Sequence, residues 1–212
     1  MPGTLMHIAF GKMVYELLGI KALNKTEFLL GNLLPDEALD KDKSHYRLKA
    51  HESGYLLPDL ASAEEELFKI DEPLKLGAYS HLYFDFHFLK DKLFDSFLWQ
   101  DGYAISKRNG MRWTTEEFFS REVFYTSYGE LNSLFIRDGL VDLEEINRLP
   151  EPIPTAGIEA LDTRRAKTWR RELFEFLSYE HKYTGTILDY GETVQAMKQI
   201  SSTLAEKIRN II

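Results

Sequence analysis

Apolar side chains recur at helical spacing along most of the chain, which predicts a largely helical protein. In residues 5–18 the apolar positions share one helix face, and Gly19 follows the last of them. A second helix, capped by Asn24 or Thr26, is expected to stop at Pro35, because proline interrupts a helix interior. The same periodicity predicts helices over 59–70, 114–131, 142–149, 163–179 and 192–211.

The strongest helix pattern begins at Asp71-Glu72-Pro73, where carboxylates precede a proline in the first helical turn, and it is expected to run to Phe97. Over residues 103–114 the apolar period changes toward that of strands, and Asn109-Gly110 is the best short-range signal for a hairpin. Residues 37–58 are rich in charges and turn formers and are predicted as a long loop with one short turn at most.

These elements predict an all-α fold, a single multi-helix domain over residues 1–212. A hairpin at about 103–114 is expected as its only sheet, with helices over 115–212 following it. More than about half of the residues should be helical, above the usual third.

Composition and charge exclude several classes of protein. Of the 212 residues 44% are hydrophobic, enough to bury a core, and none is cysteine, which excludes disulfide scaffolds and thiolate metal sites. The formal charge of −8 argues against duplex nucleic acid as a partner. No apolar run is long enough for a transmembrane segment, and charged residues interrupt the first 20 positions, where a secretory signal would lie. We therefore expect a cytoplasmic protein.

Histidines are concentrated early in the chain, since five of the six lie within residues 1–90. His81 and Asp85 are four residues apart on the strongest predicted helix, so their side chains project from one face. An imidazole and a carboxylate on one face form half of a metal site, and a buried His–Asp hydrogen bond without a metal is the alternative. Gly77, one turn before His81, would let another backbone approach this helix closely.

Three other residues carry ligand atoms in the first 50 positions. Asp36 follows the helix that Pro35 is expected to end, where a solvated turn aspartate is the alternative. His45 lies in a charged loop, where surface histidines are common. His7 lies beside the apolar stripe of the first helix, where a buried structural histidine is the default. Taken singly, none of the three indicates a metal.

Taken together, these residues form a recognisable series within positions 1–91: His7, a Gly-x-x-x-Pro-Asp motif ending at Asp36, His45, and the His81-x-x-x-Asp85 helix. In order and spacing the series resembles the zinc-dependent phospholipase C superfamily, which also includes single-strand nucleases. The resemblance implies an all-helical fold in which His7, Asp36, His45, His81 and Asp85 bind a divalent metal, zinc, as one or two ions.

The resemblance also implies a function, that of a metal-dependent hydrolase. A metal-activated water would attack a phosphodiester or phosphomonoester, such as a phospholipid head group or a nucleotide. Asp85 would bridge or position the ions and Asp36 would be a general base, so both are catalytic candidates. His51 and Glu52 lie close to His45 and are candidates to support or replace a ligand.

One motif of that superfamily, a downstream His-x-x-x-Glu, has no counterpart, because His181 is followed four residues later by Gly185. His87 and Asp91 repeat the spacing of the first His–Asp pair, but His87 faces about 120° away from it. The missing motif supports a second interpretation, a non-catalytic metalloprotein in which the ion staples helices together. The sequence also has no adjacent His-Asp pair, the signature of another class of helical phosphohydrolases.

Overall fold

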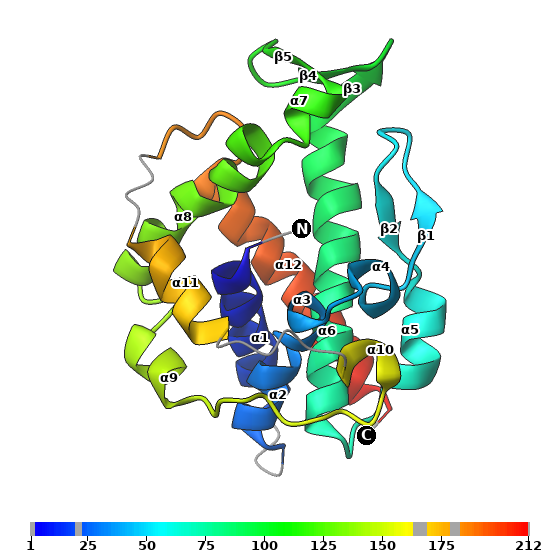
Figure 1. Ribbon diagram of the computed structural model, residues 1–212, viewed down its shortest axis with the longest axis vertical. Helices are drawn as coiled ribbons and strands as arrows, with labels where there is room; N and C mark the ends of the chain where they lie inside the picture. The colour runs from blue at the N-terminus through cyan, green and yellow to red at the C-terminus, as the bar shows by residue number, and fades with distance from the viewer. Residues whose placement is uncertain (1–2, 20–22, 163–168, 179–182, 212) are drawn as a thin grey trace.

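Helix α6 (Pro73–Phe88) lies at the centre of the fold (Figure 1). Around it pack α1 (Thr4–Leu18), α2 (Lys25–Gly31), α5 (Leu60–Leu67) and α12 (Tyr190–Arg209). The structure, a computed structural model, describes residues 3–19, 23–162, 169–178 and 183–211. Helices account for 62% of these residues, which confirms the predicted mainly helical class. Within them, no helix has both the length and the apolar character needed to span a membrane.

The predicted helix boundaries agree best with the structure where a capping residue defines them. Gly19 takes a left-handed φ of 63° after α1, and the Asn24 side chain accepts a hydrogen bond from the Glu27 amide at the start of α2. Asp59 caps α5 in the same way, and Asp189 caps α12. The peripheral helices are α9 (Leu143–Arg148), α10 (Glu159–Asp162) and α11 (Trp169–Leu177). Positions 163–168 and 179 of the predicted helix lie outside the described residues.

Residues 37–58 contain regular structure, so their prediction as a long loop is wrong. Pro35 does not stop a helix; it lies in the first turn of the short helix α3 (Leu34–Glu37), where a missing N–H is tolerated. Helix α4 (Lys41–Ser44) follows, and strands β1 (Arg47–Ala50) and β2 (Leu56–Pro58) then pair antiparallel. Elements of three or four residues are too short to show a period in the sequence.

The predicted hairpin at Asn109-Gly110 is present, but it is not the only sheet. Strands β4 (Tyr103–Ser106) and β5 (Arg112–Thr114) flank the turn, and β3 (Phe97–Gln100) pairs with the other side of β4. Gly110 has the positive φ, 72°, that the turn requires. A π-turn (Leu89–Leu93) and a 3₁₀ turn (Phe94–Ser96) extend α6 up to β3. The β1–β2 pair is a second sheet, which corrects the expectation of one.

The capping box predicted at Thr114 and Glu117 forms, yet the helix that it opens is short. The Glu117 amide donates to Thr114 Oγ1 at 3.1 Å, and the Glu117 carboxylate accepts from the Thr114 amide at 2.8 Å. Helix α7 (Thr115–Phe118) ends there, because the backbone at Ser120 is extended. A π-turn over Arg121–Tyr125 then leads into α8 (Thr126–Arg137). The single helix predicted over 114–131 is therefore two helices joined by a π-turn.

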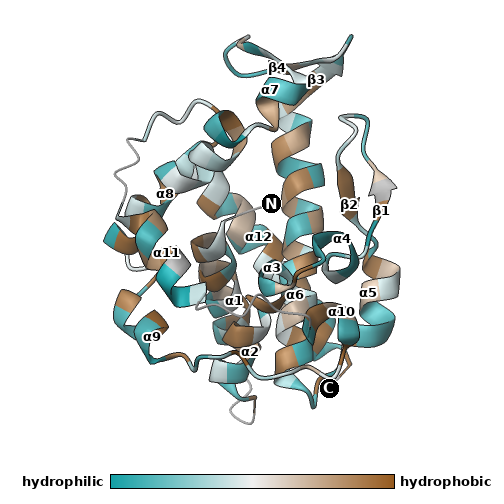
Figure 2. Cartoon of the chain, in the orientation of Figure 1, coloured by the Kyte–Doolittle hydropathy of each residue, from teal (hydrophilic) through white to brown (hydrophobic). Residues whose placement is uncertain are grey.

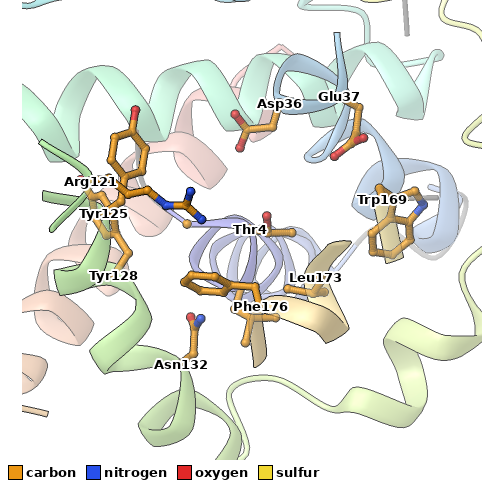
Figure 3. A pocket seen from close by; sticks show the side chains of 12 residues that line it. Thr4, Asp36, Glu37, Arg121, Tyr125, Tyr128, Asn132, Trp169, Leu173 and Phe176 are labelled. Atoms are coloured by element: carbon orange, nitrogen blue, oxygen red, sulfur yellow. The ribbon is translucent and has the colours of Figure 1, made fainter. Parts of the chain in front are cut away.

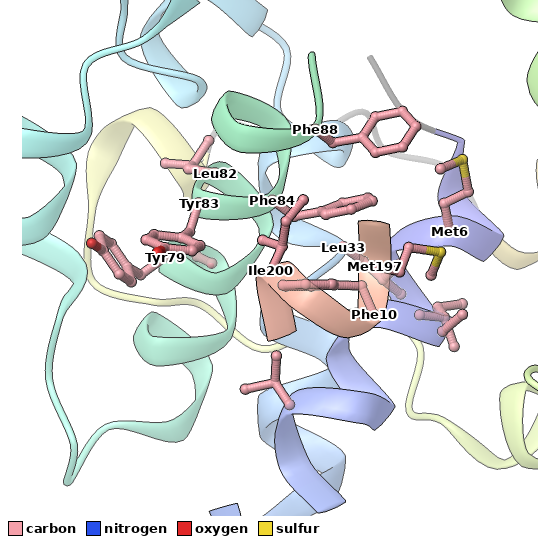
Figure 4. Packing of buried hydrophobic residues seen from close by; sticks show 14 of the residues in the cluster. Met6, Phe10, Leu33, Tyr79, Leu82, Tyr83, Phe84, Phe88, Met197 and Ile200 are labelled. Carbon is pink, nitrogen blue, oxygen red and sulfur yellow. The ribbon is translucent and has the colours of Figure 1, made fainter. Parts of the chain in front are cut away.

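The core lies between α1, α6 and α12 and is strongly aromatic (Figure 4). The rings of Phe10 and Phe84 stack with their centroids 4.4 Å apart, and Met197 and Ile200 lie beside them. Figure 2 shows hydrophobic residues along the length of α1 and α6. Every residue from Leu5 to Gly11 is buried, so this half of α1 has no face open to solvent. Any polar residue in it is held inside the protein.

Helices α2 and α6 meet through their glycines. A β-carbon on Gly77 would lie 2.1 Å from the carbonyl oxygen of Phe28 and 2.9 Å from the α-carbon of Gly31, so no side chain fits there. A β-carbon on Gly31 would meet the Leu74 carbonyl oxygen at 2.2 Å. The close backbone approach expected at Gly77 is confirmed. It brings the chain that follows α2 against the turn of α6 that carries His81.

Candidate metal centre

The five predicted ligand residues lie together in the interior, although they come from four separate segments. Helix α1 supplies His7, α3 supplies Asp36, His45 directly follows α4, and α6 supplies both His81 and Asp85. Asp36 is 18% exposed, and the other four side chains are no more than 1% exposed. One ligand atom from each of His45, His81 and Asp85 lies within 4.8 Å of the other two, and the same holds for His7, Asp36 and His81. Metal binding by this cluster stays a prediction.

Two backbone carbonyl groups set the orientation of the histidine rings. The Nδ1–H of His81 donates to the Asn32 carbonyl oxygen at 2.7 Å, and the Nδ1–H of His45 donates to the Lys41 carbonyl oxygen at 3.0 Å. Because a carbonyl oxygen can only accept, Nδ1 carries the hydrogen on both rings. Both Nε2 atoms then face the cluster, which is how metal-binding histidines are usually held.

Three ligand atoms form a nearly regular triangle. His45 Nε2 lies 3.2 Å from His81 Nε2, and Asp85 Oδ2 lies 3.6 Å from the first and 3.5 Å from the second. Ligands of a tetrahedral zinc ion, with bonds of about 2.0–2.1 Å, lie about 3.3 Å apart. With both rings neutral, the two Nε2 lone pairs repel each other unless a cation or a shared proton lies between them. The donor set and its spacing therefore fit a divalent metal.

Asp85 and His7 carry buried polar atoms that have no hydrogen-bond partner in the described part of the chain. This is true of both carboxylate oxygens of Asp85 and of both ring nitrogens of His7. His7 Nε2 lies 3.3 Å from Asp85 Oδ1, and the His7 ring stacks on the His81 ring with centroids 3.6 Å apart. An unpaired buried polar group costs about 1–3 kcal/mol, and more when it is charged. A cation bound to this carboxylate would therefore stabilise the folded protein.

Asp36 lies at the edge of the cluster nearest to solvent. Its Oδ1 atom is 3.6 Å from His45 Nε2 and 3.5 Å from the Lys41 ammonium group. Burial would raise the pKa of Asp36, but attraction to His81, Lys41 and His45 outweighs burial and lowers this pKa to about 2. The Ser44 hydroxyl donates to a carbonyl oxygen of α3 at 2.8 Å, which ties α4 to α3 and holds His45 beside Asp36.

Different pKa shifts of the histidines determine where a proton lies when no metal is bound. Burial and repulsion from His81 lower the pKa of His7, and they lower the pKa of His45 to about 3. Burial would lower the pKa of His81 as well, but Asp85 outweighs burial and raises it. Burial would raise the pKa of Asp85, but attraction to His81 and His7 holds it far below its usual value. Among the three histidines, His81 is thus the one on which a second ring proton is favoured when no metal is bound, and a metal would compete with that proton.

A pocket of about 430 Å³ opens beside the cluster, and Asp36 is one of the residues that line it (Figure 3). Arg121 of the π-turn and Tyr128 of α8 line one side, and Trp169 and Phe176 of α11 line another. Figure 3 shows the Asp36 carboxylate and the Arg121 guanidinium both pointing into the pocket. A small molecule in the pocket would therefore meet a residue of the cluster and a positively charged group.

The remaining histidines lie apart from the cluster or outside the described residues. His51 packs on neighbouring aromatic rings, Glu52 is exposed, and no described contact joins either of them to the five cluster residues. The structure therefore does not bring this candidate pair to the cluster. The His87 Nδ1–H donates to Asp91 Oδ2 at 2.7 Å near the surface, and His181 is not among the described residues.

Sequence reasoning missed the pocket residues Arg121, Tyr128, Asn132 and Trp169, which belong to no motif. Arg121 falls inside a predicted helix that the structure divides, and the others occupy positions typical of a helix that packs on a core. Ser120 is a sequence signal that the predicted helix divides at this point, because serine favours helix starts over helix interiors.

No family model, curated protein or solved structure matches the chain in comparisons with known proteins. The resemblance to the zinc-dependent phospholipase C superfamily thus rests on the order and spacing of five residues in the sequence. The geometry of the cluster and of the adjoining pocket is the basis for assigning a function.

Proposed function

We propose that this chain is a metal-dependent hydrolase of phosphate esters. The observation that carries the proposal is the triangle of His45 Nε2, His81 Nε2 and Asp85 Oδ2, with Asp36 at its edge lining the pocket. Both candidate ligand groups in the described residues include His81. Because the His81 Nδ1–H donates to the Asn32 carbonyl oxygen, only Nε2 of this ring can bind a metal, so we propose a single ion. Zinc suits a donor set of imidazole nitrogen and carboxylate oxygen.

When bound, a divalent cation would supply the positive charge that attracts an anionic phosphate ester and makes a neighbouring water more acidic. Asp36 is placed to take the proton of that water, because its carboxylate lies at the edge of the cluster, 3.6 Å from His45 Nε2, and lines the pocket. Asp85 would hold the ion together with His45 and His81, since its carboxylate lies among the rings of His7, His45 and His81 and would balance the positive charge there.

Burial favours a second candidate, the non-catalytic metalloprotein. Four of the five side chains are almost completely buried, as expected for an ion that staples α1, α4 and α6 together. A staple has a closed ligand shell, whereas hydrolysis needs an open position for water. The partial exposure of Asp36 at the pocket favours hydrolysis.

A panel of nitrophenyl phosphomonoesters and phosphodiesters distinguishes the two candidates. Protein loaded with one equivalent of zinc should release nitrophenolate from at least one class of ester. Chelation should abolish the release, and added zinc should restore it, because the cation supplies the charge for the reaction. A zinc-loaded protein that is inert toward the whole panel would contradict the hydrolase and favour the non-catalytic metalloprotein.

A further inference from the structure

The π-turn between α7 and α8 directs two of its residues into the pocket. Arg121 and Tyr125 are the first and last residues of the turn, and both line the pocket. Figure 3 shows the guanidinium extending toward Thr4, near the middle of the pocket. The Thr126 hydroxyl donates to the Arg121 carbonyl oxygen at 3.1 Å, which helps to hold the turn. Single turns of π-helix, such as this one, are rare and frequently occur at functional sites.

The Arg121 guanidinium has no ion pair and no side-chain hydrogen bond within the described ranges. All five of its N–H donors are therefore available. Asp36 and Glu37 line the same pocket, so an anion is favoured there only near Arg121 and near a bound cation. A guanidinium that faces a pocket in this way is suited to bind an oxyanion through two parallel N–H···O bonds.

Buried polar atoms in the walls of the same pocket also have no partner in the described structure. They are the Tyr128 hydroxyl, the Trp169 Nε1 and the Asn132 Oδ1, on side chains that are at most 5% exposed. All three residues line the pocket. The Tyr128 hydroxyl and the Trp169 indole N–H are hydrogen-bond donors, so an oxygen-rich ligand that reached either group would supply the partner that it lacks.

We propose that Arg121 and the Tyr128 hydroxyl form an anion subsite that holds the phosphoryl oxygens of the substrate. This inference rests on the proposed hydrolase function and adds the residues that recognise the phosphoryl group. Arg121 supplies the charge and the paired donors, and Tyr128, from the first turn of α8, supplies a further donor from the buried wall.

Titration calorimetry with inorganic phosphate, on the full chain in zinc-loaded and chelated forms, tests the subsite. Arg121→Ala should weaken phosphate binding to the zinc-loaded protein by at least about 10-fold. Arg121→Lys should weaken it less, because lysine keeps the charge but not the paired bonds. The control is Arg137→Ala, which removes an exposed arginine paired with Asp138 at 2.7 Å and should leave phosphate affinity unchanged.

Tyr128→Phe separates ligand binding from a structural role. Because no described residue bonds to the hydroxyl, its loss should not lower the melting temperature, whereas phosphate affinity should fall roughly 3- to 10-fold.

Equal phosphate affinity in the wild type and in Arg121→Ala would overturn the subsite, even with zinc-dependent hydrolysis intact. Phosphate binding that depends on Arg121, in a protein that hydrolyses no ester, would uphold the subsite and contradict the hydrolase.

Discussion

Asp85→Asn is expected to lower the rate of zinc-dependent phosphoester hydrolysis by about 10³-fold. The carboxylate is 1% exposed and lies 3.3, 3.6 and 3.5 Å from ring nitrogens of His7, His45 and His81, so it is the negative charge at the centre of the cluster. Asparagine keeps its size but removes the charge that holds the cation. A loss of several kcal/mol of charge stabilisation corresponds to about three decades in rate. Initial rates at saturating zinc measure the effect.

The matched control for this substitution is Asp91→Asn. His87 and Asp91 repeat the His-x-x-x-Asp spacing at the surface end of the same helix, where their side chains are 2.7 Å apart. Loss of this exposed pair should leave the hydrolysis rate unchanged. Thermal melting followed by circular dichroism shows whether each variant is folded, so that a lower hydrolysis rate can be distinguished from unfolding. A folded Asp85→Asn protein with the wild-type rate would place catalysis somewhere other than this cluster.

Gly77→Ala should lower the free energy of unfolding by about 3 kcal/mol, the upper end of the usual range for overpacking a core. The added β-carbon would lie 2.1 Å from the carbonyl oxygen of Phe28, which cannot move unless α2 moves. Such a movement would also displace the Asn32 carbonyl oxygen that accepts from His81, so zinc affinity should fall together with stability. Urea unfolding with an unchanged m-value measures the free energy.

Gly191→Ala provides the contrast, because Gly191 is exposed in the first turn of α12. Its β-carbon would meet nothing closer than Asp189 Oδ1 at 3.4 Å. Alanine has the higher helix propensity, so stability should stay unchanged or rise by up to about 1 kcal/mol. Similar small effects at both glycines would show that α2 and α6 do not pack as closely as described here.

The cluster residues could be predicted as a set because their order and spacing along the chain resemble those of a known superfamily, and local spacing by itself supports only the His81–Asp85 pair. Local spacing places His81 and Asp85 on one face of α6, and Asp36 follows the proline in the first turn of α3. Helix starts were predictable for the same reason, since Asn24 and Thr114 bond to amides only three residues ahead. Such signals act within one or two turns and need no knowledge of the rest of the chain.

The pocket and the small sheets depend on packing that no local pattern records. Arg121 and Trp169 line one pocket only because the π-turn and α11 come together in space. Strands β1 and β2 have three or four residues, and their register shifts between Arg47 and Lys49, which hides the alternation expected of strands. The complete burial of His7 likewise depends on α6 and α12 covering α1.

Zinc content per chain is the measurement that tests the metal centre most directly. Wild-type protein loaded with excess zinc and then desalted should retain about one zinc per chain by mass spectrometry. His81→Ala removes the Nε2 atom that lies 3.2 Å from His45 Nε2, so this variant should retain far less than half as much. His87→Ala, which changes the half-buried histidine near the end of the same helix, should retain as much zinc as the wild type, because His87 bonds to Asp91 and not to the cluster. A wild-type chain that retains no zinc, or a His81→Ala chain that retains as much as the wild type, would contradict a metal centre at these residues.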